Sequence, residues 1–136
     1  MEIILASGSP RRKQIFEQLG IPFRVVPSTY EEDMTLKLPP ASLARRLAHG
    51  KAQEVATREN GTIIGVDTFI YKDQIIGKPT SKEHAAQILA SIAGQEIKVC
   101  SGIAIIKGDT TITDSEVTRV KIAPMDRATI KRYINT

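Results

Sequence analysis

The chain has 136 residues, of which 41% are hydrophobic and 25% are charged, a composition that fits one globular domain and excludes a disordered chain. The net charge of +4 is spread evenly: residues 1–60 carry nine basic and seven acidic groups, and residues 61–136 carry ten and eight. With no basic tail and only 4% aromatic residues, a stable complex with nucleic acid is not expected. A small anionic ligand fits this modest basic excess.

Few residues could form a disulfide or a zinc site. Cys100 is the only cysteine, which excludes an internal disulfide and points to a reducing compartment. His49 and His84 lie far apart in the sequence, and there is no C-x-x-C motif. The N-terminal stretch MEIILASGSPRRK is neither a signal peptide nor a membrane span. We therefore expect a cytoplasmic protein that does not associate with membranes.

The predicted elements alternate between strand and helix in the first half of the chain. Residues 2–6 predict a buried strand, and Ser9 and Pro10 begin a helix that Gly20 ends. The remaining elements follow from apolar patterns and turn residues: strand 23–28, loop 29–40, helix 41–58, strand 62–71, a hairpin turn at 72–74, helix 81–93, strands 96–106 and 110–122, and a helix from about 126. This order predicts a mixed α/β fold, with a curved central sheet flanked by helices.

The first candidate site is the segment ASGSPRR at residues 6–12. A strand that leads through Ser-Gly-Ser into a helix presents backbone N–H groups, which can bind an anion. Arg11 and Arg12 fall in the first helical turn, where a cation opposes the helix dipole, and a bound phosphate would relieve that conflict. A capped surface helix with two solvated arginines explains the same residues equally well.

Lys51 is the second candidate. On a helical wheel it falls near the centre of the apolar arc of helix 41–58. A lysine at that position either extends its ammonium group to water or meets an anion. Ahead of that helix, the acidic group Glu31, Glu32 and Asp33 is ordinarily a solvated loop. It is also what a magnesium ion uses when it binds through carboxylates and substrate phosphates.

Asp67 is the least expected residue of the strand TIIGVDTFIY, because aspartate is rarely found in strand interiors. It is followed by Thr68 and, ten residues later, by Gly77-Lys78-Pro79, and the hairpin would bring Lys78 back toward the same strand. A structural aspartate that caps a turn is the alternative. It is the weaker one, because no turn residue follows Asp67 before Lys72.

Five separated motifs resemble the Maf family of nucleoside triphosphate pyrophosphatases, in the order and spacing of that family. They are SGSPRRKQIFEQLGIPF, PSTYEE, RLAHGKA, GVDT and IIGKP, and the resemblance extends over essentially the whole chain. The SPRR and DT versions are similar to the branch that acts on dTTP and UTP. The resemblance implies a Maf/ITPase-like fold, elongated, with a cleft between two lobes, and hydrolysis of the substrate to a nucleoside monophosphate and pyrophosphate.

The resemblance also implies a role for each candidate residue. Asp67 matches the general base of the family, and Glu32 matches its acidic residue on the metal side. The matches to its phosphate-binding groups are Ser7, Arg11, Arg12, Lys51 and Lys78. Arg12 and Thr68 match positions linked to nucleotide choice. The implied cofactor is a divalent metal, Mg²⁺ or alternatively Mn²⁺, and the implied assembly is a homodimer.

Two departures from the family pattern define the alternative function. The glycine-rich G-x-A-G-A-Y-G-I-Q-G segment has no counterpart here, and the usual SG-x-T-H reads AGQEIK. Residues 1–136 are therefore expected to be a single Maf-like domain truncated at its C-terminus. The alternative to a pyrophosphatase is a nucleotide-binding module with little or no catalysis.

Overall fold

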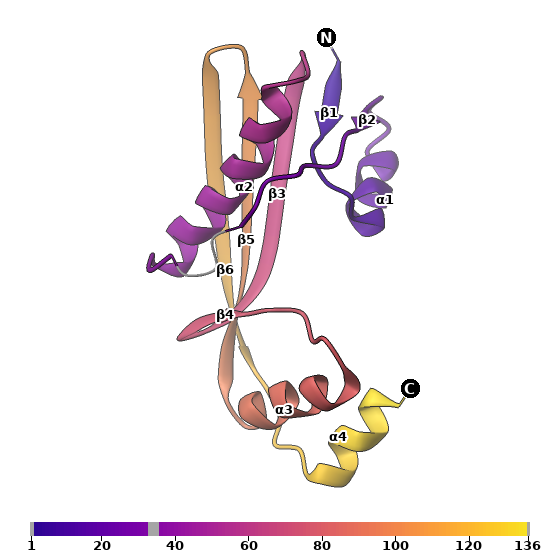
Figure 1. Ribbon diagram of the computed structural model, residues 1–136, viewed down its shortest axis with the longest axis vertical. Coiled ribbons are helices and arrows are strands. Elements are labelled where there is room, and N and C mark those ends of the chain that lie inside the picture. The colour runs from indigo at the N-terminus through magenta and orange to yellow at the C-terminus, as the bar shows by residue number, and fades with distance from the viewer. Residues whose placement is uncertain (1, 33–35, 136) are drawn as a thin grey trace. The chain divides into compact units, whose positions relative to one another are not determined.

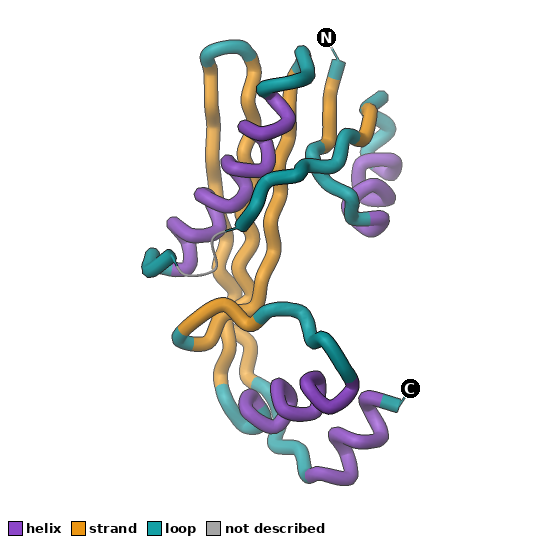
Figure 2. The backbone as a smooth tube through the Cα atoms, in the orientation of Figure 1, coloured by secondary structure: helices purple, strands orange, loops and turns teal. Residues whose placement is uncertain are grey.

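The structure is a computed structural model that describes residues 2–32 and 36–135. The helices and strands of these residues, labelled in Figure 1, are in chain order β1 (Ile3–Leu5), α1 (Pro10–Gln18), β2 (Arg24–Val25), α2 (Pro40–Ala56), β3 (Thr62–Lys72), β4 (Gln74–Ile76), α3 (Lys82–Ile92), β5 (Glu96–Lys107), β6 (Thr110–Lys121) and α4 (Arg127–Ile134). The interleaved helices and strands (Figure 2) confirm the predicted mixed α/β fold.

The predicted element boundaries agree with the structure to within two residues at most ends. The exception is the strand expected at 23–28, which is confined to Arg24–Val25. Pro27 has no backbone N–H and cannot extend the ladder, so the pairing stops near it. Ser9 caps α1 as predicted, and its Oγ accepts a hydrogen bond from the backbone N–H of Arg12 at 3.4 Å.

The sheet has the strand order β2-β1-β3-β5-β6, with β4 paired to β3. β1 runs parallel to both of its neighbours, and Leu5 is in register with Val25 of β2 and with Ile64 of β3. β3 and β4 are antiparallel and are joined at Asp73, whose φ of 62° lies in the left-handed region that aspartate tolerates in turns. The predicted hairpin at residues 72–74 is confirmed.

The chain divides into two compact units, and β3, β5 and β6 contribute residues to both. The first unit comprises Met1–Thr68 and Ser101–Glu116, and the second comprises Phe69–Cys100 and Val117–Thr136. The core of the first unit lies between α2 and its strands. The buried residues that form it are Ile4, Ala6, Val26, Ala48, Ala52, Val55, Ile63, Ala104 and Ile106.

Within the first unit, α2 lies directly against the sheet at two glycines. A Cβ atom on Gly65 of β3 would clash with the carbonyl oxygen of Ala48 and lie 2.8 Å from the amide nitrogen of Ala52. A Cβ atom on Gly102 of β5 would clash with the backbone of Ala44. Because alanines of the helix face glycines of the strands, the two backbones approach more closely than larger side chains allow.

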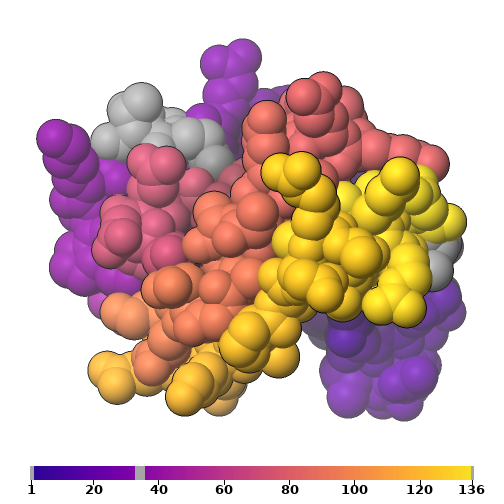
Figure 3. All heavy atoms as spheres, turned by 90° about the horizontal axis from the view of Figure 1, so that it is seen from below, coloured from indigo at the N-terminus to yellow at the C-terminus, as the bar shows by residue number. Residues whose placement is uncertain are grey.

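In the second unit, α3 and α4 contact each other, and their atoms lie side by side in Figure 3. Asp126 caps α4 by accepting a hydrogen bond from the backbone N–H of Thr129 at 2.7 Å. Cys100 is fully buried, and this burial raises the pKa of its thiol. Of the helices in residues 2–32 and 36–135, none combines the length and the apolar composition needed to cross a bilayer.

Candidate functional site

A buried carboxylate on β3 pairs with a lysine of α2. Asp67 is 5% exposed, and its Oδ1 lies 2.7 Å from Nζ of Lys51. Side chains alternate along a strand, so Asp67 shares a face with Gly65, where α2 comes closest to the sheet. This approach brings the lysine of the helix to the carboxylate of the strand. The aspartate is therefore buried together with a cationic partner.

The same lysine contacts a second carboxylate. Glu32, in the loop that precedes α2, places Oε1 3.1 Å from Nζ of Lys51. The side chain of Lys51 is 19% exposed. The lysine therefore meets anionic groups and does not simply extend its ammonium group to water. Glu31 is exposed, and Asp33 lies outside the described residues.

Ser7 and Arg12 form a second group, at the start of α1. Ser7 is buried, and its Oγ accepts hydrogen bonds from Nη1 of Arg12 at 3.1 Å and from the backbone N–H of Ser9 at 3.3 Å. A hydroxyl group that accepts two hydrogen bonds still has its own proton to donate. The guanidinium group of Arg12 is thereby turned back toward the loop between β1 and α1, while Arg11 is exposed.

Two further candidates, Thr68 and Lys78, are both exposed. Thr68 is exposed, and because it follows Asp67 along β3 it lies on the opposite face, where its Oγ1 is 3.3 Å from Oγ of Ser101. Lys78 follows β4 in the second unit, and its side chain is exposed. Within residues 2–32 and 36–135, no hydrogen bond or ion pair joins the Lys51 group to the Ser7 group.

The carboxylates at Lys51 are the residues that could hold a metal. Among the described residues, no group of three or more His, Cys, Asp or Glu side chains has a geometry suited to a metal ion. Mg²⁺, however, is commonly held by one or two carboxylates together with substrate phosphates and water. Glu32 and Asp67 already share one cationic group, the ammonium of Lys51, so their oxygen atoms fit that requirement.

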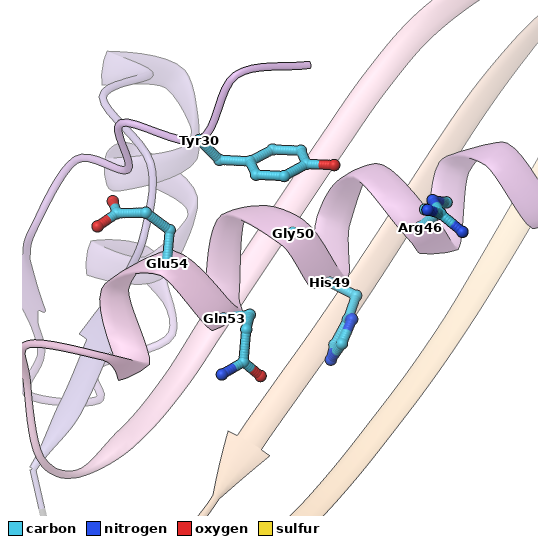
Figure 4. Close-up of a pocket in the computed structure, with 6 residues that line it drawn as sticks. All are labelled: Tyr30, Arg46, His49, Gly50, Gln53 and Glu54. Carbon is cyan, nitrogen blue, oxygen red and sulfur yellow. The ribbon is translucent and has the colours of Figure 1, made fainter. Parts of the chain in front are cut away.

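Three residues near Lys51 in the structure or the sequence have no role predicted from the sequence: Tyr30, Gly50 and Glu54. They line an open pocket of about 460 Å³ on the outer side of α2, together with Arg46, His49 and Gln53 (Figure 4). One signal was available in the sequence. A glycine in the middle of a helix is unfavourable and therefore usually has a packing reason, and Gly50 sits in the middle of α2.

The chain belongs to the Maf family: the family model described as Maf-like protein matches residues 2–136. A protein of Acetivibrio thermocellus named dTTP/UTP pyrophosphatase is 37% identical, over all of this chain and 73% of its own length. A protein of the same name from Ruminiclostridium cellulolyticum is 40% identical, over 98% of this chain and 72% of its own length. The resemblance found in the five motifs is confirmed.

Solved structures share the fold at much lower sequence identity. The Ham1 protein of Staphylococcus aureus matches with a TM-score of 0.64 and 17% identity, over 90% of this chain and 72% of the other. A nucleoside-triphosphatase, also titled dITP/XTP pyrophosphatase, from Mycobacterium abscessus matches with a TM-score of 0.60 and 16% identity, over 92% and 76%. At this level of identity the match concerns the fold alone, and it agrees with the expected ITPase-like architecture.

Proposed function

We propose that the protein is a nucleoside triphosphate pyrophosphatase that hydrolyses dTTP and UTP to the nucleoside monophosphate and pyrophosphate. Its membership of the Maf family supports this function, as do the names of its relatives at 37% and 40% identity. The structural observation that carries the proposal is the buried carboxylate of Asp67, held 2.7 Å from Lys51. A rigid, oriented carboxylate beside a cation is what the activation of water near phosphates requires.

In the proposed reaction, Asp67 orients a water molecule and accepts its proton. The water oxygen attacks the α-phosphorus, and the bond from that phosphorus to the oxygen shared with the β-phosphate breaks. The electron pair of this bond leaves on pyrophosphate, and the products are the monophosphate and pyrophosphate. Because Asp67 is on a strand and not on a loop, its carboxylate is held in place before the substrate arrives.

Cationic and polar groups of the chain bind the phosphates. The ammonium of Lys51 has three N–H donors, and contacts to Asp67 and Glu32 occupy two of them, so one can donate to a phosphate oxygen. Ser7 and Arg12 offer a hydroxyl proton and a guanidinium group at the start of α1, where helix N–H groups also favour an anion. Arg11 and Lys78 are proposed to bind phosphates through their exposed side chains.

A divalent metal completes the proposed site. Glu32 would hold it, together with Asp67 and the phosphates, and Mg²⁺ is the first choice, with Mn²⁺ as the alternative. When bound, the metal supplies positive charge that neutralises the phosphate oxygens. Arg12 and Thr68 are proposed to influence the choice of nucleotide. A cytoplasmic location, a homodimer and a single domain over residues 1–136 belong to the same proposal.

The test is product analysis with a panel of nucleoside triphosphates, with and without Mg²⁺ or Mn²⁺. We expect metal-dependent release of dTMP and pyrophosphate from dTTP, and of UMP and pyrophosphate from UTP. In ¹⁸O-water, attack at the α-phosphorus places the label in the monophosphate. Release of a diphosphate with inorganic phosphate, or label in pyrophosphate, contradicts the proposed reaction, and binding without hydrolysis supports a nucleotide-binding module instead.

A further inference from the structure

Residues 27–29 are hydrogen-bonded to the C-terminal end of α2 and to Arg58, which follows it. The backbone N–H of Thr29 donates to Oε1 of Glu54 at 2.7 Å. Arg58, which is paired with Glu54 at 2.8 Å, donates from Nη2 to the carbonyl oxygen of Pro27, also at 2.8 Å. The Arg58 guanidinium, and then the Thr29 amide, hold the pKa of Glu54 at about 2. Residues 27–29 are thus attached to the helix from two sides.

The next residue, Tyr30, rests on the helix at Gly50. A Cβ atom added at position 50 would clash with three carbon atoms of the Tyr30 ring, so the ring occupies the space that any other residue at this position would use. Figure 4 shows the ring extended along α2 above Gly50. The backbone N–H of Tyr30 donates to Oγ of Ser28 at 3.1 Å, so the backbone of Tyr30 is linked to residues 27–29.

Glu32 follows two residues later, and Lys51 is the residue after Gly50. The ion pair between them is partly exposed, with 32% of the Glu32 side chain and 19% of the Lys51 side chain accessible. Ion pairs with this exposure contribute little on their own, because solvent screens them and ordering the side chains opposes them. The ion pair alone is therefore too weak to fix the position of Glu32, and the contacts of residues 27–30 with α2 must contribute.

We propose that Tyr30, seated on Gly50, is a positioning residue that holds Glu32 at the proposed metal and phosphate site. This inference rests on the proposed function, in which Glu32 would hold the divalent metal. Tyr30 acts through the backbone of residues 30–32 and does not itself touch substrate. Gly50 has a role in the same positioning, because only glycine leaves room for the Tyr30 ring at this place on α2.

The test uses the variants Gly50→Ala and Tyr30→Ala and the double variant. Affinity for Mg²⁺ is measured by calorimetry in the presence of an α,β-methylene analogue of dTTP, which cannot be cleaved between these phosphates. Both single variants should bind Mg²⁺ about 10–100-fold more weakly, the loss typical when a group that supports a metal ligand is removed. The double variant should be no weaker than Tyr30→Ala, because the three heavy atoms nearest to the new methyl group all belong to the ring that this variant removes.

Two controls keep the ring and the helix intact. Tyr30→Phe retains the ring and should bind Mg²⁺ with the affinity of the wild type. Gln53→Ala changes an exposed side chain of α2 and should also leave the affinity for Mg²⁺ unchanged. Melting temperature gives a readout that needs no ligand. Gly50→Ala should lower it when Tyr30 is present and raise it in the Tyr30→Ala background, where alanine is the better helix former.

The outcomes separate the inference from the function. If the wild type releases no pyrophosphate but the melting temperatures change sign as expected, the proposed function fails and the seat of Tyr30 on Gly50 stands. If the wild type is active and Gly50→Ala binds Mg²⁺ as the wild type does, the positioning role is wrong. Additive losses in the double variant also overturn it, because they show that the two residues act independently.

Discussion

At the scale of single residues, the pair formed by Asp67 and Lys51 can be tested by changing one atom. Asp67→Asn keeps an oxygen that can accept from Lys51 but cannot take a proton from water. We expect turnover to fall by about 10²–10⁴-fold, as for other losses of a general base. Stability should fall by only about 1–2 kcal/mol, the scale of a weakened hydrogen bond to a charged group.

The matched comparison is Lys51→Met, which leaves the buried Asp67 without its partner. An uncompensated buried charge costs more than a weakened hydrogen bond, so this variant should be the less stable of the two. Chemical denaturation and steady-state turnover of both variants measure the two effects separately. Turnover near that of the wild type in a folded Asp67→Asn variant would show that the aspartate serves only the ion pair.

Glu54 gives a prediction about pH. Hydrogen bonds from Arg58 and from the Thr29 amide lower the pKa of this carboxyl from 4.5 to about 2. A depressed folded-state pKa means that the stabilisation is present above about pH 4.5 and is lost as the pH falls toward 2. Glu54→Gln removes this proton uptake, so its melting temperature should fall less steeply than that of the wild type over this interval. Parallel curves for the two proteins would contradict the assignment.

At the scale of elements, the contact of α2 with the sheet depends on glycine. Gly65→Ala would place a methyl group against the backbone of α2 at Ala48 and Ala52, so the helix or the strand must shift. We expect a loss of about 1–3 kcal/mol or more, as for other overpacked cores. Turnover should fall as well, because the helix that carries Lys51 would be displaced from Asp67.

Gly77→Ala is the control for this variant. A Cβ atom at position 77 would have no heavy atom within 4 Å among the described residues, and the φ angle of this glycine is not positive. Its stability should stay within about 0.5 kcal/mol of the wild type. Denaturation midpoints of the two variants supply the comparison. Equal stability would mean that α2 does not lie as close to β3 as the structure has it.

At the scale of the whole molecule, local patterns predict the elements well and the contacts between them less well. The helix over 81–93 and the strand over 62–71 match the structure closely, because apolar periodicity and capping residues are local signals. The sequence shows a lysine on an apolar arc and an aspartate in a strand, but the contact between Lys51 and Asp67 is seen only in the structure. Both are residues that need a partner.

The seat of Tyr30 on Gly50 could not be predicted in this way. Twenty positions separate the two residues, and the loop between them carries no periodic signal that would fix its path. Thr68 shows the opposite case, in which residues adjacent in the sequence do not meet. It follows Asp67 directly, but side chains alternate along a strand, so the two lie on different faces. Motif spacing indicates candidate residues, and only the backbone path shows which of them meet.

β6 lies at one edge of the sheet, and in the first unit its side chains are almost all exposed. A free strand edge is a template onto which other chains can add, and this is how many proteins begin to aggregate. Here Asp114 and Glu116 interrupt the run of threonines, and Ser115 between them accepts a hydrogen bond from Arg45 of α2 at 2.7 Å. If identical copies stacked along this edge in parallel and in register, each of these carboxylates would face its own copy, and this repulsion opposes polymerisation in that register.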